Sequence, residues 1–370
     1  MTSKLWPTVS LFFASALIAP LLYIALAFAM DPLNLYGDSR HIYQDLSRDD
    51  RVRAALIIRS GSYNSIILGS SMLKRVNENT LSEGKYKYVN VSTSGSTIHE
   101  RTKYLEHILN VKKLQSVVFS MDYALSLHRR NYPVNSDPDG WMYLFDKSRA
   151  NDVLIYLEKD YVKCIFEMII ADCSMRRMSA RKSDQTYIDL LSKDRLIAGL
   201  DGWISENGRW RLIKSRVNQI VQDGSFVNHD TTDYHEDLLK LEQLARDNRS
   251  LEFNLVIPPY SMAYLKLMYD YHNPLFSEYQ NFLSDVYETF KDSSNVRVIF
   301  LDGNPLTKDL NNYIDMRHYI GPVTDRLISE VKVGSNFLNE NFSHRFTSIE
   351  RELDAYDITP LMELYKDSFQ

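Results

Sequence analysis

The feature that most constrains the fold is a repeated arrangement in which a short apolar run ends in small or polar residues. Three such runs stand in the first third of the chain: Ser65 to Leu68 before Gly69, Tyr88 to Val91 before Ser92, and Ser116 to Phe119 before Ser120. Runs of this kind are typical of buried parallel strands whose carboxyl ends face a cleft. Between the second and third runs, Thr97 to Asn110 has apolar residues at helical spacing, which completes a βαβ unit.

The same arrangement returns late in the chain. Strands are predicted at Phe253 to Ile257 and Val296 to Leu301, and helices at Tyr234 to Asn248, Pro274 to Phe290 and Val323 to Val331. Strands that alternate with helices predict an α/β fold, here a three-layer α/β/α sandwich with a parallel five-stranded sheet.

Between these two parts, residues 124–232 are predicted to form a helical insertion that serves as a lid, a partner surface or a substrate groove. Its composition is rich in Arg, Lys and Tyr, with helices predicted from Asp152 to Ala171 and from Tyr187 to Ile204. The remaining boundaries follow from composition: residues 31–64 a polar connection, 65–334 the α/β domain that carries the insertion, and 335–370 a helical tail without an assigned role.

The beginning of the chain lacks charge. No charged residue stands between Lys4 and Asp31, and Val9 to Met30 is almost entirely apolar. Such a stretch is long enough to cross a bilayer as a helix, and a transmembrane helix tolerates Pro20. The positive-inside rule then predicts a cytoplasmic stub and a single membrane anchor within residues 1–30, with the bulk of the chain on the periplasmic or extracytoplasmic side of a bacterial inner membrane. A cleavable signal peptide ending at Ala27-Phe28-Ala29 and a buried soluble helix are the alternatives.

Charge and cysteine content exclude other classes. The formal net charge of -5 provides no broad basic field, so nucleic acid is not expected as a partner. Cys164 and Cys173 are nine residues apart, and in one continuous helix they would lie about 13 Å from each other, too far for a disulfide. Two buried thiols are therefore expected. No His cluster with zinc-like spacing stands near them, and no metal or other cofactor is predicted.

Ser71 is the candidate nucleophile. It ends the sequence Gly69-Ser70-Ser71, directly after the first predicted strand and before a predicted helix. A serine there lies at the carboxyl edge of the sheet, where open α/β folds bind ligands, and a helix N-terminus beside it would favour an alkoxide. Glycine permits the sharp turn that this position needs.

Asp315 and His318 are the candidate partners of that serine. They belong to Asp315-Met316-Arg317-His318, which follows the last predicted strand. Residues three apart in a tight turn point to the same side, so the carboxylate can hold the imidazole in one tautomer while the other ring nitrogen faces the cleft. The same spacing is also common on solvated loops.

Taken together, a serine after the first strand and an Asp-x-x-His after the last resemble the SGNH/GDSL hydrolase superfamily. The resemblance implies a flavodoxin-like sandwich in which Ser71 is the nucleophile, His318 the general base and Asp315 its orienting partner. Ser70 stands where many members carry aspartate. With its apolar N-terminus, the chain is most similar to a membrane-anchored subgroup that includes the D-alanyl-lipoteichoic acid transfer protein and, more loosely, the alginate O-acetylation proteins.

The resemblance also implies an oxyanion hole made by the backbone N–H groups of Ser71 and Gly95, the latter after the second strand. Many members take a third donor from an asparagine after the third strand, where this chain has Asp122. The side chains expected to line the site are those of Ser70, Asn90, Asp122 and Tyr260.

The function that the resemblance implies is that of an envelope acyltransferase or esterase. It would act on O-acyl groups of a cell-surface polysaccharide through a covalent acyl-serine, with a membrane-bound O-acyltransferase as a partner. Because Asp122 stands where many members carry the asparagine donor, an alternative remains. It is a non-catalytic scaffold of the same fold that binds a glycan or the membrane partner.

Overall fold

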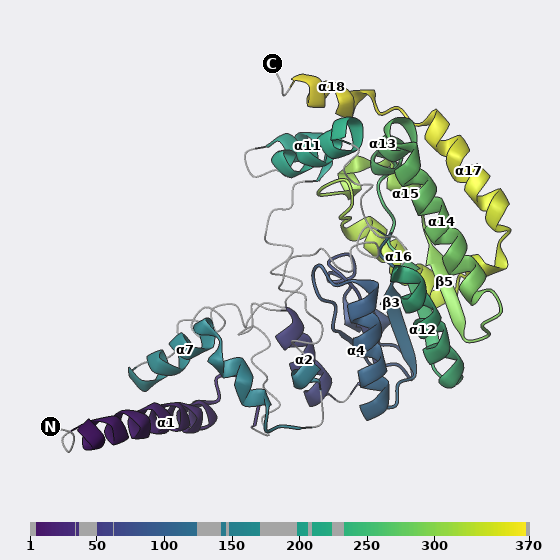
Figure 1. Cartoon of the computed structure of the whole chain (residues 1–370). Coiled ribbons are helices and arrows are strands. Elements are labelled where there is room, and N and C mark those ends of the chain that lie inside the picture. The colour runs from purple at the N-terminus through teal and green to yellow at the C-terminus, as the bar shows by residue number, and fades with distance from the viewer. Residues whose placement is uncertain are drawn as a thin grey trace. The chain divides into compact units, whose positions relative to one another are not determined.

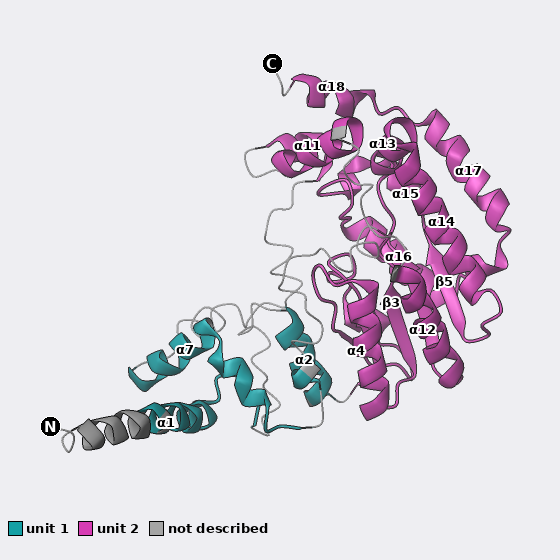
Figure 2. Cartoon of the chain, viewed as in Figure 1, with its two compact units in different colours: residues 1–61, 139–186 teal, residues 62–138, 187–370 magenta. Residues whose placement is uncertain are grey.

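The structure is a computed structural model that describes residues 5–33, 35–36, 50–61, 63–123, 142–145, 148–170, 198–205, 209–223 and 233–367, without the side chains of residues 5–15, 17, 60, 142, 160, 223 and 233. Two compact units make up the chain (Figure 2). One takes in residues 1–61 and 139–186, and the other takes in residues 62–138 and 187–370. The predicted insertion at 124–232 is therefore divided between the two units.

The second unit is built on one sheet. Its strands are β1 (Ser65–Leu68), β2 (Tyr88–Asn90), β3 (Ser116–Ser120), β4 (Glu252–Ile257) and β5 (Val296–Phe300). All pairs are parallel, and the strand order is β2-β1-β3-β4-β5. The predicted α/β class and the five-stranded parallel sheet are thereby confirmed. This order is a common one for doubly wound sheets, in which the chain changes direction between β1 and β3.

Helices cover the sheet. The predicted helices appear as α4 (Ile98–Val111), α12 (Asp233–Asp247), α14 (Asn273–Phe290) and α16 (Gly321–Val333). In Figure 1, α4, α12 and α14 lie side by side, and α12 contacts both of the others. The helix α16 instead contacts α3 (Glu78–Leu81) and β5. Burial from both faces explains why the strands are runs of apolar residues rather than alternating ones.

Part of the predicted insertion belongs to the unit that holds the sheet. It comprises α10 (Gly199–Ile204), α11 (Trp210–Asn218) and the π-helical turn η3 (Gln219–Asp223). Trp203 is fully buried, and its Nε1 donates to the carbonyl oxygen of Tyr313 at 2.9 Å. The backbone N–H of Gly199 donates to the same oxygen at 3.2 Å. This segment is thus attached to the chain just before Asp315.

The rest of this unit consists of short elements and the C-terminal helices. They are α13 (Met262–Tyr271), α15 (Pro305–Lys308), η5 (Leu310–Asn312), η6 (Phe337–Asn339), α17 (Phe342–Ala355) and α18 (Thr359–Asp367). The tail is integrated into the unit, because Phe346 packs on Phe276 and the hydroxyl of Tyr365 donates to Asn218 Oδ1 at 2.9 Å.

The other unit contains α1 (Leu5–Met30), α2 (Asp50–Ser60), η1 (Met142–Leu144), η2 (Asp152–Leu157) and α7 (Lys159–Ile170). Tyr23 of α1 stacks on Phe166 of α7, with ring centroids 6.0 Å apart. In the part of the chain that the structure describes, no helix combines the length and the apolar character that crossing a membrane requires. The anchor predicted for residues 1–30 is therefore not confirmed.

The expectation of two thiols was wrong, because Cys164 is disulfide-bonded. The only other cysteine in the sequence, Cys173, lies outside the described residues. The expectation assumed one continuous helix across both positions; Cys164 lies in α7, which is described from Lys159 to Ile170.

Candidate active site

Ser71 lies just beyond the carboxyl end of β1. A Cβ atom at Gly69 would lie 2.6 Å from the Cβ of Leu73, so the turn into Ser71 requires glycine. Residues 71–75 form turns, and the next helix, α3, begins only at Glu78. The prediction of a helix directly after Ser71 was wrong.

The reason lies in Asn90. Its Nδ2 donates to the carbonyl oxygens of Leu73 and Val76, both at 2.9 Å, and so binds carbonyl groups that a helix would have paired with its own N–H groups. Its Oδ1 accepts the backbone N–H of Ser92 at 3.0 Å. Asn90 therefore ties the turn after Ser71 to β2, and a helix dipole does not act on the serine.

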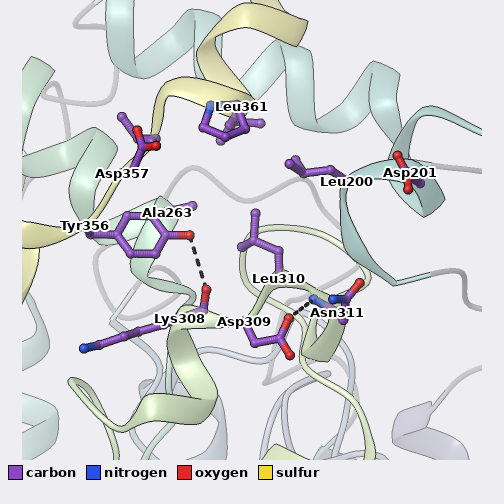
Figure 3. A pocket seen from close by; sticks show the side chains of 12 residues that line it. Leu200, Asp201, Ala263, Lys308, Asp309, Leu310, Asn311, Tyr356, Asp357 and Leu361 are labelled. Atoms are coloured by element: carbon purple, nitrogen blue, oxygen red, sulfur yellow. Dashed lines mark hydrogen bonds between the residues drawn. The ribbon is translucent and has the colours of Figure 1, made fainter.

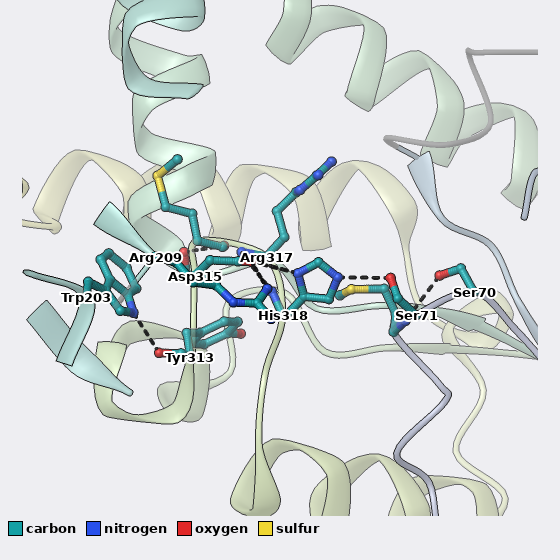
Figure 4. A network of polar contacts seen from close by, with 11 residues as sticks. Ser70, Ser71, Trp203, Arg209, Tyr313, Asp315, Arg317 and His318 are labelled. Atoms are coloured by element: carbon teal, nitrogen blue, oxygen red, sulfur yellow. Dashed lines mark hydrogen bonds and ion pairs between the residues drawn. The ribbon is translucent and has the colours of Figure 1, made fainter. Parts of the chain in front are cut away.

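The structure brings Ser71, His318 and Asp315 together, although the first two are 247 positions apart in sequence (Figure 4). Ser71 Oγ lies 2.9 Å from His318 Nε2. His318 Nδ1 lies 2.9 Å from Asp315 Oδ2 and 3.1 Å from Asp315 Oδ1. The two bonds run from opposite nitrogens of one imidazole, which is the geometry of a nucleophile, a base and an orienting acid.

Asp315 is buried and ionised. Burial alone would raise the pKa of its carboxyl group, but the hydrogen bond and charge of His318, followed by the charge of Arg216, hold that pKa well below its usual range. Its Oδ1 also accepts the backbone N–H groups of Arg317 and His318, both at 2.9 Å. A carboxylate with these partners remains an acceptor for the imidazole N–H at neutral pH.

The loop that carries Asp315 and His318 is fixed at several points. The N–H of Ile314 donates to the carbonyl oxygen of His318 at 2.9 Å and closes the loop. Ser261, the N-cap residue of α13, donates to the carbonyl oxygen of Met316, with its Oγ at 2.7 Å and its backbone N at 3.2 Å. These bonds hold the base before any substrate arrives.

The two expected oxyanion donors lie on adjacent loops. Thr93 N and Ser96 Oγ donate to the carbonyl oxygen of Gly69 at 2.8 and 3.2 Å, and Gly69 N donates to Ser92 Oγ at 3.0 Å. These bonds hold the loop with Gly95 against the Ser71 turn. Gly95 has a φ of +72°, a conformation that favours glycine. Within the described residues, neither Gly95 N–H nor Ser71 N–H donates to a protein acceptor.

Three of the side chains expected to line the site support it from behind. Ser70 and Asp122 are 0% and 1% exposed, and Asn90 is 6% exposed. Ser70 Oγ donates to Asp122 Oδ1 at 2.8 Å, and Ser120 Oγ donates to Asp122 Oδ2 at 2.6 Å. Arg101 Nη2 forms an ion pair with Asp122 Oδ2 at 3.1 Å. Asp122 is therefore committed to a buried network and does not replace the missing third donor.

Tyr260, the fourth expected lining residue, is also buried. Its ring packs edge-on against Tyr264 and Tyr279, at centroid distances of 5.3 and 6.2 Å. It belongs to the aromatic core beneath α13 and α14. Because Tyr260 follows a strand end, it was expected to face the site. Its ring instead points into the core, where it packs against aromatic neighbours.

Sequence reasoning missed two arginines. Arg101 lies in α4 and is paired with Asp122, while Arg209 Nη1 lies 3.1 Å from Asp315 Oδ2 (Figure 4). Arg209 stands 106 positions before Asp315. For Arg209, the sequence offered only the Arg-rich composition of the predicted insertion, and composition does not show which residue an arginine contacts.

A separate pocket of about 380 Å³ lies in the same unit (Figure 3). Leu200, Leu310 and Leu361 form its apolar wall, and the hydroxyl of Tyr356 donates to the carbonyl oxygen of Lys308 at 3.4 Å. No residue of the Ser71, His318 and Asp315 group lines it. Its lining residues offer no serine or histidine, so acyl-transfer chemistry belongs to the Ser71 edge.

No group of three His, Cys, Asp or Glu side chains within the described ranges is placed to hold a metal ion. Comparison of the chain with models of protein families, with curated proteins and with solved structures found no match. The assignment of function therefore rests on the geometry around Ser71.

Proposed function

We propose that this protein is a serine acyl-transfer enzyme, an esterase or an acyltransferase. One observation carries the proposal: Ser71 Oγ lies 2.9 Å from His318 Nε2, while Asp315 holds the opposite ring nitrogen of the same imidazole. The alternative of a non-catalytic scaffold would be favoured by a histidine beyond reach of the serine. The 2.9 Å separation instead suits proton transfer.

In the first half-reaction, His318 Nε2 takes the proton of Ser71 Oγ, and the oxygen attacks the carbonyl carbon of an ester. The C=O π bond becomes a lone pair on an oxyanion, which we propose is bound by the N–H groups of Ser71 and Gly95. The tetrahedral intermediate then collapses, the ester C–O bond breaks, and the leaving oxygen takes the proton from His318. The product is an acyl-serine.

In the second half-reaction, an alcohol or water molecule gives its proton to His318 and attacks the acyl-serine. Ser71 leaves and regains its proton from the imidazolium. Transfer to a sugar hydroxyl makes the protein an acyltransferase, and transfer to water makes it an esterase. Asp315 remains ionised throughout and stabilises the imidazolium in both halves.

The substrate and location that we propose follow from several features together. We infer O-acyl groups of a cell-surface polysaccharide as the substrate, a membrane-bound O-acyltransferase as a partner, and a single-pass anchor in residues 1–30 with the domain outside the cytoplasm. The uncharged start of the chain supports the anchor, and the disulfide-bonded Cys164 is in keeping with an oxidising compartment. The 2-1-3-4-5 strand order supports a flavodoxin-like SGNH fold.

A fluorophosphonate probe tests the chemistry. The full chain should be labelled, whereas Ser71→Ala and His318→Ala should not, because the probe needs an activated serine oxygen. Ser294→Ala, a change at an exposed serine, is the matched control and should label like the wild type. A correctly folded wild type that takes up no label and turns over no aryl acetate would favour the scaffold.

Acyl analysis in cells tests the substrate. Envelope polysaccharide from cells that carry the wild type or Ser71→Ala should differ in O-acyl content, and the polymer that changes is the substrate. Identical acylation in both strains, with labelling intact in vitro, would place the substrate elsewhere.

A further inference from the structure

Arg209 touches the carboxylate that orients the base. We propose that Arg209 is a positioning residue for the acyl-transfer reaction, acting through Asp315 on His318. The inference rests on the function proposed above. It concerns a residue that lies outside the Gly-Ser-Ser and Asp-x-x-His motifs, in the segment between β3 and α12.

The geometry gives Arg209 a defined task. Asp315 Oδ1 is held by the backbone N–H groups of Arg317 and His318, which belong to its own loop. Within the described residues, Asp315 Oδ2 lies 2.9 Å from His318 Nδ1 and 3.1 Å from Arg209 Nη1. Arg209 thus reaches from outside the loop to the carboxylate oxygen closest to the imidazole. Without it, the carboxylate gains freedom to rotate at that oxygen.

The segment that carries Arg209 is itself bound to the same loop. Trp203 Nε1 and Gly199 N both donate to the carbonyl oxygen of Tyr313, two positions before Asp315. Gly199 has a φ of +82°, and a Cβ there would lie 2.3 Å from Asn311 Oδ1. Arg209 itself is tied to α11, because its carbonyl oxygen accepts the backbone N–H of Ile213 at 3.0 Å, and its side chain is 39% exposed.

Charge adds a second effect. Among the described residues, His318 from the same loop and Arg216 within α11 lower the pKa of Asp315 by their charge, and Arg209, just before α11, forms an ion pair with it. Each added cation favours the carboxylate and disfavours a further positive charge nearby. Removal of the Arg209 charge should therefore move the acid side of the pH profile to higher pH.

The experiment measures kcat and KM for an aryl acetate from pH 5 to 9 in the full chain. Arg209→Gln should lower kcat roughly 10-fold with KM little changed, because the base is misoriented rather than the substrate lost. The pH at which kcat/KM is half-maximal on the acid side should rise by roughly half a unit or more. Arg209→Lys keeps the positive charge. It should restore the wild-type pH of half-maximal kcat/KM but recover only part of the wild-type kcat.

Arg246→Gln is the matched control, since Arg246 pairs with Glu242 on an exposed face of α12, and it should behave like the wild type. The inference would be overturned if Arg209→Gln left both kcat and the pH of half-maximal kcat/KM unchanged. It would also be overturned if the pH profile of Arg209→Lys were identical to that of Arg209→Gln. Failure of the proposed function looks different: turnover would then persist in Ser71→Ala.

Discussion

Asp122 and Asp315 are both buried carboxylates that pair with an arginine, yet the two arginines stand in different surroundings. The side chain of Arg101, which pairs with Asp122, is 0% exposed, whereas that of Arg209, which pairs with Asp315, is 39% exposed. Asp122 has Ser70 and Ser120 as further partners. The partner that distinguishes Asp315 is a histidine whose other nitrogen meets the candidate nucleophile.

This difference distinguishes a carboxylate that supports the fold from one that takes part in the proposed reaction. Asp122 accepts hydrogen bonds from Ser70 and Ser120 and pairs with Arg101, so its network holds the turn that presents Ser71. Asp315 is instead linked through His318 to Ser71 Oγ. Removing one partner of a buried ion pair lowers the free energy of unfolding by several kcal/mol, whereas a partly exposed pair contributes about 0–1 kcal/mol. Loss of an arginine should therefore lower stability much more in the Asp122 network than in the Asp315 network.

The largest effect is expected from Asp315→Asn. The amide keeps the shape but favours the wrong tautomer of His318, so kcat/KM for an aryl acetate should fall about 10⁴-fold. Asp122→Asn should lower kcat/KM far less, because Asp122 touches no reacting atom. Equal losses in the two variants, measured on folded protein, would erase the distinction between the networks.

Arg101→Met should have the next largest effect, this time on stability. It leaves Asp122 buried without its cation, and the free energy of unfolding should fall by about 3–5 kcal/mol. Urea unfolding monitored by circular dichroism measures it. Arg246→Met on an exposed face is the control, and a loss in Arg101→Met no larger than in this control would contradict the proposed weight of the buried pair.

Asp302 sharpens the comparison as a third buried carboxylate. Tyr279 donates to it, and among the described residues no arginine hydrogen-bonds its carboxylate, since Arg345 donates to its backbone oxygen instead. Burial raises the pKa of Asp302 to about 7, although the hydrogen bonds of Tyr279 and Tyr260 and the charge of Arg345 oppose the shift.

The native Asp302 carboxyl therefore keeps a proton that the unfolded chain has released. The free energy of unfolding should fall as pH rises from about 4 to 7, by a few kcal/mol from this group. Asp302→Asn should flatten that part of the curve in urea unfolding at pH 5 and pH 8. Parallel curves for the two proteins would show that Asp302 is not the group responsible.

The smallest effect is expected for Arg209→Met on stability. A pair with a 39% exposed arginine should contribute no more than about 1 kcal/mol to the free energy of unfolding. The same urea experiment checks it. A loss as large as that of Arg101→Met would mean that Arg209 serves the fold rather than the orientation of Asp315.

Much of the fold was predictable because its signals are local. A buried parallel strand is an apolar run a few residues long, and a covering helix shows its period within one element, so β1 to β5 and the helices α4, α12, α14 and α16 could be located from sequence. The helix α13 was missed, since only His272 separates its last residue, Tyr271, from the start of α14 at Asn273, which left no separate signal.

The candidate site was predictable in part. Ser71 sits in a short motif at the end of β1, and Asp315 and His318 share a short motif in the loop that follows β5, α15 and η5. The roles of Asn90, Asp122 and Tyr260 were not predictable, because proximity to a strand end does not say whether a side chain turns to the cleft or to the core. Their buried partners decided it.

The sequence by itself determined the five strands, their parallel arrangement, the helices α4, α12, α14 and α16, and the order of the serine and Asp-x-x-His motifs. Only the tertiary structure decided that Asp122 binds Arg101 and that Arg209 reaches Asp315. The physical reason is range: secondary structure follows from spacing within about a dozen residues, whereas a buried charge is satisfied by whichever group packing brings within 3 to 4 Å. For Asp315 that group comes from 106 positions away.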